Sequence, residues 1–217
     1  MGRDGLPPRR RGALLLAAAV ALVGLASNAP ASSIGPSCGS CQGSIYSLET
    51  TLAPVSTTAT TETWNVSYTI DTSGYTGTGT HLNQVALKVS ASITAGTLVA
   101  APGGVGLWNV IMGGINANGC SMAGSGFDCA FATSPGVSPN VPGGVYTWVF
   151  QLTMQTGSLL LGPNEASVKA RYVSDTGFKV GALVSEDITL SQVPEPGALL
   201  LLAAAAISRA LFVRPKH

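Results

Sequence analysis

The sequence predicts an all-β protein, an antiparallel β-sandwich, flanked by an N-terminal signal helix and a C-terminal transmembrane-type helix. Three observations lead to this prediction. Apolar and polar residues alternate through the middle of the 217-residue chain, turn-forming residues separate the alternating runs, and long apolar runs lie near the two ends. Alternation with a period of two buries one face of a strand and leaves the other in solvent, as in antiparallel sheets.

Four long runs carry the alternation, and each has one face of predicted core residues. These residues are Trp64, Val66, Tyr68 and Ile70 in the run 63–70; Val85, Leu87, Val89, Ala91 and Ile93 in 83–93; Tyr146, Trp148, Phe150, Leu152 and Met154 in 145–154; and Ala166, Val168, Ala170 and Tyr172 in 165–173. Shorter strands are predicted at 45–52, 97–100, 107–112 and 179–190.

The segments between these runs have the composition of turns. They read DTSGYTGTGT at 71–80, APGGVG at 101–106, SPGVSPNVPGG at 134–144 and SDTG at 174–177. Glycine tolerates positive φ and proline fixes φ near −65°, so both favour chain reversal. About eight short strands with this spacing favour a sandwich over a closed barrel.

The N-terminus has the features of a secretory signal peptide. Arg9 to Arg11 form a positive segment, residues 13–25 form an apolar run, and Ala29-Pro30-Ala31 is an Ala-x-Ala cleavage site. The apolar run is shorter than the ~20 residues needed to span a bilayer. We therefore expect signal peptidase to remove residues 1–31 and the mature protein to begin at Ser32.

The C-terminus carries a second apolar run. Residues 197–213 are long enough only for a marginal spanning helix, and the basic residues Arg209, Arg214 and Lys216 favour a cytoplasmic end. Pro194 and Pro196 precede the run and are expected to keep their segment extended and free of sheet pairing. The chain thus divides into a signal peptide (1–31), an exported domain (32–192) and a tail (193–217).

This tail resembles the PEP-CTERM sorting signal. The resemblance lies in Val193, Pro194, Glu195 and Pro196, followed by an apolar run and terminal basic residues, although the basic residues are more widely spread than is usual in the family. The resemblance implies recognition by exosortase, a membrane cysteine protease of Gram-negative bacteria that make extracellular polysaccharide. It also implies cleavage close to Pro-Glu-Pro, after transient retention at the inner membrane, and transfer to the cell surface or matrix.

Four cysteines form two local pairs, Cys38 with Cys41 and Cys120 with Cys129. Disulfides are the default in an exported protein, and we predict these two pairings. One alternative is an all-cysteine zinc site, because His81 is the single histidine between the two end segments. A thioredoxin-like role for CGSC would need a βαβ context that the sequence does not predict.

No catalytic set is predicted from the sequence. SDTG at 174–177 is similar to the Asp-Thr-Gly of aspartic proteases, and DTSG at 71–74 is a near match, but both fit turns between strands. A Ser/His/Asp triad would have to use His81, which no Gly-x-Ser-x-Gly accompanies. Glu186 and Asp187 are adjacent on a predicted strand and should point to opposite faces. We predict no enzyme, no cofactor and no metal.

Charge and composition restrict the class of partner. Residues 32–192 contain four Lys or Arg and eight Asp or Glu, a net charge of −4, which gives no basic surface for nucleic acid. The sequence favours a non-catalytic surface or extracellular-matrix protein. The alternative is a carbohydrate-binding module for extracellular polysaccharide, with Trp108 in its short glycine-flanked segment as the exposed platform. Trp64 and Trp148 are expected in the core.

Overall fold

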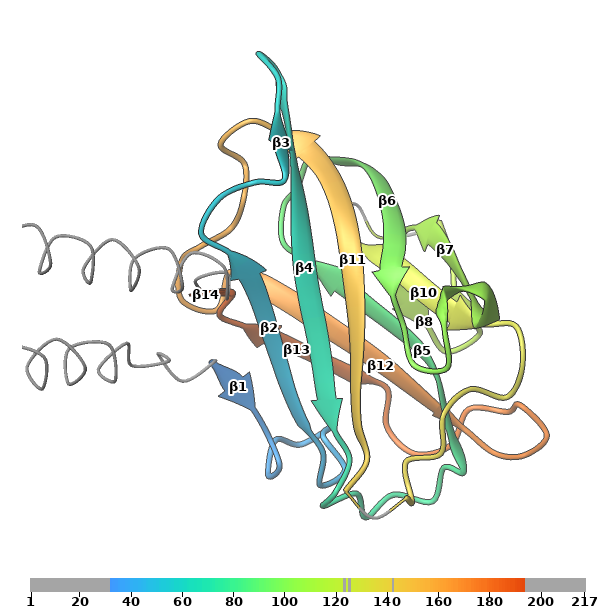
Figure 1. Ribbon diagram of the computed structural model, residues 1–217. Helices are drawn as coiled ribbons and strands as arrows, with labels where there is room; N and C mark the ends of the chain where they lie inside the picture. The colour runs from blue at the N-terminus through green and yellow to red at the C-terminus, as the bar shows by residue number, and fades with distance from the viewer. Residues whose placement is uncertain (1–31, 123, 125, 142, 194–217) are drawn as a thin grey trace, which may run out of the picture. The chain divides into compact units, whose positions relative to one another are not determined.

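Two β-sheets face each other and enclose the hydrophobic core (Figure 1). The computed structural model describes residues 32–193 except 123, 125 and 142, and these fall within one compact unit, Pro30–Val193. The predicted signal peptide, with Ala29 and Ala31, and the predicted tail from Pro194 onward lie outside the described residues. For the described residues the prediction of an all-β sandwich is confirmed.

The first sheet has the strand order β1-β2-β4-β11-β6, with β14 paired to β2 and β3 paired to β4. Its strands are β1 (Ser33–Ile34), β2 (Ile45–Thr51), β3 (Ser56–Thr57), β4 (Thr61–Asp71), β6 (Ile93–Ala100), β11 (Val145–Gln155) and β14 (Ser191–Val193). All pairings in this sheet are antiparallel except that of β14 with β2, which is parallel.

The second sheet has the order β13-β12-β5-β10-β7 and is antiparallel throughout. Its strands are β5 (His81–Lys88), β7 (Trp108–Met112), β10 (Asp128–Ala132), β12 (Ala166–Val173) and β13 (Val184–Ile188). A small hairpin joins β8 (Ile115–Asn116) to β9 (Gly119–Cys120), and η1 (Val105–Leu107) is a short 3-10 helix. Among the described residues, no helix combines the length and apolar character needed to cross a membrane.

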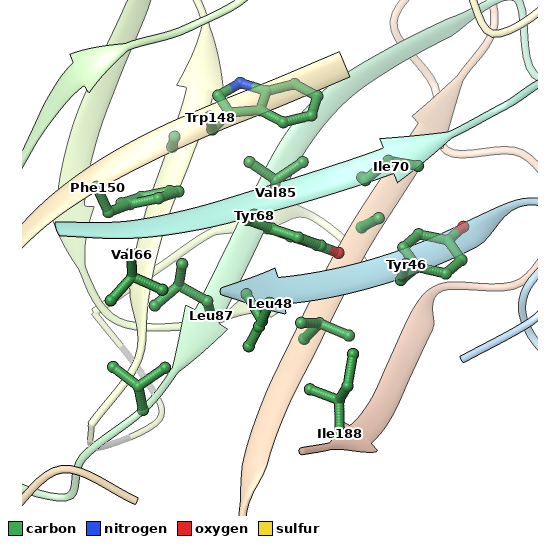
Figure 2. Close-up of a cluster of buried hydrophobic side chains, with 14 of the residues drawn as sticks. Tyr46, Leu48, Val66, Tyr68, Ile70, Val85, Leu87, Trp148, Phe150 and Ile188 are labelled. Carbon is green, nitrogen blue, oxygen red and sulfur yellow. The ribbon is translucent and has the colours of Figure 1, made fainter. Parts of the chain in front are cut away.

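The core lies between the sheets and follows the predicted alternation most closely in β4 and β11. These two strands pair in one unbroken register from Val145↔Asp71 to Gln155↔Thr61. Their inward residues are buried, and Trp64 and Trp148 are in the core as predicted. Figure 2 shows Tyr46 and Leu48 of β2 and Val66, Tyr68 and Ile70 of β4 in the same apolar layer as Phe150, Val85, Leu87 and Ile188.

Buried tyrosine hydroxyls connect the two sheets inside this core. Tyr46 on β2 and Tyr172 on β12 lie 3.0 Å apart at their hydroxyl oxygens, and Ser44 Oγ lies 3.1 Å from the Tyr172 hydroxyl. Burial raises the pKa of Tyr172 to about 12. These hydroxyls therefore satisfy one another as neutral groups, which removes most of the cost of burying them.

The predicted strand at 83–93 is wrong as a single element. It divides into the end of β5 and the start of β6, which belong to different sheets. Val89 is buried as predicted, but Ala91 is exposed. The chain turns here because Ser90 Oγ accepts a hydrogen bond from the Ser92 amide at 3.0 Å, and a serine side chain that bonds the nearby backbone competes with strand pairing.

The structure differs from the predicted strands in two further ways: one strand is shorter than predicted, and one strand was not predicted. The candidate strand 179–190 contracts to β13, because Gly181 adopts a φ of +67° that a strand cannot contain. β10 has no counterpart among the predicted strands, although it lies inside the second sheet between β5 and β7. Its five residues begin with a carboxylate and alternate only weakly in polarity.

Candidate functional site

The prediction that Trp108 is an exposed glycan platform is wrong. Its side chain is 6% exposed and packs edge-on against Trp148, with ring centroids 5.2 Å apart. The indole Nε1 donates to the Pro102 carbonyl at 3.0 Å, so the polar edge of the ring is satisfied without solvent. The flanking glycines suggested exposure, but Trp108 opens β7 and faces the opposite sheet.

Both predicted disulfides are present. Cys38–Cys41 and Cys120–Cys129 have Cα–Cα distances of 5.2 and 5.9 Å. They use the four sulfurs that the alternative zinc site would need. Cys120–Cys129 joins β9 to β10 and belongs to a small apolar cluster with Ala86 and Ile115, separate from the main core.

The adjacent carboxylates of β13 have separate structural partners. Ser40 Oγ donates to Glu186 Oε1, which also lies 3.5 Å from Cys38 Sγ, so the first disulfide loop rests on β13. Asp187 instead accepts a hydrogen bond from Ser167 Oγ at 2.7 Å. The two side chains diverge, as the alternation of a strand requires, and do not form a carboxylate pair.

The predicted sorting motif begins inside the sheet. Val193 is the last residue of β14 and pairs with Thr51 of β2, so the expectation that the whole motif is free of sheet pairing is wrong at its first residue. A parallel pairing with β2 is available because β1 occupies only the neighbouring part of the same strand, at Tyr46 and Ser47. Pro194, Glu195 and Pro196 lie outside the described residues.

The two ends of the described domain meet beside β2, where β1 and β14 both pair. The backbone amide of Ser32 donates to Ser191 Oγ at 2.8 Å. Ser32 is the predicted first residue of the mature protein, and Ser191 opens the last strand. Figure 1 shows β1 and β14 both lying along β2.

The SDTG segment is the turn after β12, as the turn interpretation predicts. The Gly177 amide donates to the Ser174 carbonyl at 2.8 Å, and Gly177 has a φ of +82°. The near match DTSG is also a turn, in which Asp71 accepts a hydrogen bond from the Ser73 amide at 2.8 Å. Hydrogen bonds from Ser73 lower the pKa of Asp71.

The turn after β12 forms one wall of a pocket of about 240 Å³. Its polar lining comes from three segments: the start of β5, the loop near residue 134 and the turn itself. The polar residues in the lining are Asn83, Ser134, Ser174, Asp175 and Thr176. The pocket therefore offers hydroxyl, amide and carboxylate groups at a shallow surface.

Two contacts organise the polar side chains around this pocket. His81 Nδ1 lies 3.6 Å from Asp175 Oδ1 and 3.1 Å from Thr80 Oγ1. Arg171 is 7% exposed, and its Nη1 donates a long hydrogen bond of 3.4 Å to Asn83 Oδ1. Sequence reasoning missed both pairs, because about ninety residues separate the partners and only the pairing of β5 with β12 brings them together.

Phe178 follows this turn and its side chain is 74% exposed. Within the described part of the chain, every other aromatic side chain is buried or half-buried. The Phe178 carbonyl accepts a hydrogen bond from the Ser174 amide at 2.9 Å, which fixes the backbone beneath the ring. Its sequence signal is an aromatic residue directly after a Gly turn, a pattern that indicates the turn and leaves the exposure of the ring open.

Among the residues that the structure describes, no three His, Cys, Asp or Glu side chains are grouped as metal ligands. Among these residues His81 makes no hydrogen bond to a serine hydroxyl, because its Nδ1 faces Thr80 and Asp175. The chemistry that this region offers is hydrogen bonding to a polar molecule beside an exposed aromatic ring.

Comparison with known proteins gives no family assignment. No family model matches the chain, and no curated protein matches it. Among solved structures, the major pilin subunit BcpA of Bacillus cereus aligns with a TM-score of 0.33 and 8% identity, over 68% of this chain and 40% of that one. The C-terminal domain of the AgI/II polypeptide BspA of Streptococcus agalactiae aligns with a TM-score of 0.35 and 14% identity, over 66% and 45%.

The chain therefore spans less than half of each of these two structures. Superpositions at such TM-scores do not establish a common fold.

Proposed function

We propose that this protein is an exported, non-catalytic surface or extracellular-matrix protein that is processed through a C-terminal signal of the PEP-CTERM type. The observation that carries the proposal is the order of three features at the end of the chain: VPEP at 193–196, an apolar run from residue 197, and terminal basic residues. Signal peptidase and an exosortase-type protease are the expected processing partners. The tail holds the protein at the inner membrane only until it is cut.

The geometry of the domain supports processing at both ends. The compact unit ends at Val193, directly before the two prolines, so a cut beyond β14 removes no strand of the sandwich. A cut before Ser32 likewise leaves β1 intact. Both cuts would therefore release a complete domain, and its two disulfides suit an oxidising compartment.

Three carboxylates from the segments that resemble catalytic motifs support a non-catalytic role, because they serve the fold. Glu186 holds the first disulfide loop, Asp187 bonds Ser167, and Asp71 stabilises its own turn. None of the three carboxylates is paired with another in the way that acid–base hydrolysis needs.

The test is the intact mass of the protein recovered outside the cells, compared between the wild-type strain and a strain without exosortase. We expect a mature chain that begins at Ser32 and ends between Val193 and the apolar run in the wild type. The strain without exosortase should retain the tail in its membrane fraction. Extracellular wild-type protein that still ends at His217 would contradict the proposal and indicate an ordinary, uncut anchor.

A variant pair separates recognition of the motif from general damage to the domain. Pro194→Ala combined with Pro196→Ala should block release, because both substitutions remove the stiff extended segment before the apolar run. Pro139→Ala, in a loop of the described domain, is the matched control and should be released normally.

A further inference from the structure

We propose that the pocket beside the turn after β12 binds one sugar unit of a neutral polysaccharide, with Phe178 as its aromatic contact. The proposed function enters this inference only as the source of the polysaccharide, which is the matrix around the cell. The binding itself is a property of the described domain.

The pocket has the chemistry of a sugar site. Its carboxylate, amide and hydroxyl groups, from Asp175, Asn83, Ser134, Ser174 and Thr176, can accept from and donate to the hydroxyls of a sugar ring. Its volume of about 240 Å³ lies below the range that encloses drug-sized ligands. It therefore suits a single ring of a longer chain that continues along the surface.

A buried arginine behind the pocket holds one of its polar groups, the Asn83 amide, in place. Arg171 can only donate, so its bond to Asn83 Oδ1 orients the amide and leaves Asn83 Nδ2 as a donor for the ligand. Arg171 is buried and is a positioning residue. The His81 imidazole lies 3.6 Å from the Asp175 carboxylate, which is too far for a hydrogen bond, so Asp175 is exposed and available to a ligand.

Phe178 supplies the apolar half of the site. Sugar rings present C–H groups on their faces and hydroxyls at their edges, so they pack on an aromatic ring while hydrogen-bonding around it. Phe178 directly follows Gly177, the last residue of the pocket lining, and is not part of the lining itself, so its ring would contact the part of the sugar chain that leaves the pocket. A ring that is 74% exposed gains nothing from the core, and covering it with a ligand removes apolar surface from water.

The charges favour a neutral sugar over an acidic one. Among the residues that line the pocket, Asp175 alone is charged, so the carboxylate of a bound uronic acid would meet a like charge at close range, whereas the Arg171 guanidinium lies behind Asn83. The neighbouring cation Lys179 does not line the pocket, and its Nζ donates to the Gly181 carbonyl at 2.6 Å.

The turn that lines the pocket lies away from both described ends of the domain. In Figure 1 the turn between β12 and β13 lies at the lower right, whereas the described ends at β1 and β14 lie at the left. The site is thus on the part of the domain away from both predicted cuts, and removing either end segment should leave it unchanged.

The experiment is a titration of the full chain, purified in detergent, with four neutral hexasaccharides (cello-, malto-, manno- and galactohexaose) and with a hexagalacturonate. We expect saturable binding of at least one neutral hexasaccharide and none of the hexagalacturonate. Phe178→Ala should weaken that binding by about tenfold through loss of the aromatic contact. Asn83→Ala should weaken it by a similar factor.

Two controls keep the result specific. Met122→Ala removes another highly exposed apolar side chain and should bind as the wild type does. Unchanged circular dichroism and thermal midpoint of each variant show that the sandwich is folded. Folded wild-type protein that binds no neutral hexasaccharide, binds only the hexagalacturonate, or binds equally well in all three variants would overturn the inference. The processing experiment above does not depend on these outcomes, so either proposal can fail alone.

Discussion

Asp128 is the residue whose surroundings differ most from those of a usual carboxylate. It is fully buried at the start of β10, and neither carboxylate oxygen has a hydrogen-bond partner among the described residues. The carboxylate lies against Gly96 of β6, where a Cβ atom would collide with it. Burial raises the pKa of Asp128 to about 6, because the charged form loses its hydration.

The raised pKa predicts that this residue destabilises the fold at neutral pH. The folded protein holds the Asp128 proton more tightly than the unfolded chain, so its contribution to stability is fully present below about pH 4 and is lost as the pH rises through about 6. The shift corresponds to about 3 kcal/mol of unfolding free energy. Asp128→Asn removes the ionisable group. The free energy of unfolding of this variant should therefore depend less on pH over this range.

Urea unfolding at about pH 4 and about pH 8 measures this difference. Asp187→Asn is the matched control, because it makes the same change at an exposed carboxylate of β13 and should keep the wild-type dependence. A wild-type pH profile in Asp128→Asn would show that the buried carboxylate is not its source.

Among the elements of the fold, the small β8–β9 hairpin depends on one disulfide for its attachment to the sheet. Cys120–Cys129 ties this hairpin to β10, where Cys129 is buried against Ala86 and Ile115. The hairpin has only two residues in each strand, which is too short for stability without an attachment.

Loss of this disulfide should destabilise the domain more than its loop length alone implies. Closing a loop with a sequence separation of 9 contributes about 2–3 kcal/mol in the chain-entropy model. The variant with Cys120→Ala and Cys129→Ala also loses packing in the small cluster, so we expect at least this loss in unfolding free energy. The corresponding variant with Cys38→Ala and Cys41→Ala is the comparison. The prediction would be contradicted if the variant with Cys120→Ala and Cys129→Ala were as stable as the wild type.

Stability should be distributed unevenly over the whole molecule. β4 and β11 are central in their sheet and pair over eleven residues, whereas β1, β14 and β6 lie at its edges. β6 is also more exposed than the central strands along most of its length. A strand whose amides are paired and covered on both sides opens only when the whole sandwich unfolds.

Hydrogen exchange monitored by mass spectrometry measures this distribution. Peptides from β4 and β11 should exchange slowest, at the rate of global unfolding, while those from β1, β14 and β6 should exchange earlier. Uniform exchange across all five strands would show that the sandwich opens as one unit, with no separate fraying of its edges.

The sequence alone determined the fold class and the main core strands, because burial on one face of a strand imposes a period of two on local residues. β4, β11 and β12 were predicted from this pattern, and both disulfides were predicted from cysteines close in sequence. The tail motif is also read from residues that are close in sequence, so the proposed function could be based on it.

Tertiary structure alone decided which residues meet across sheets and loops. The same apolar, glycine-flanked pattern around Trp108 fits an exposed or a buried ring, and only the opposing Trp148 determines that it is buried. The pairing of β5 with β12 brings Arg171 to Asn83 and His81 to Asp175, and Asn83 and Asp175 both line the pocket. Such contacts depend on long-range strand order, which a pattern of nearby residues does not contain.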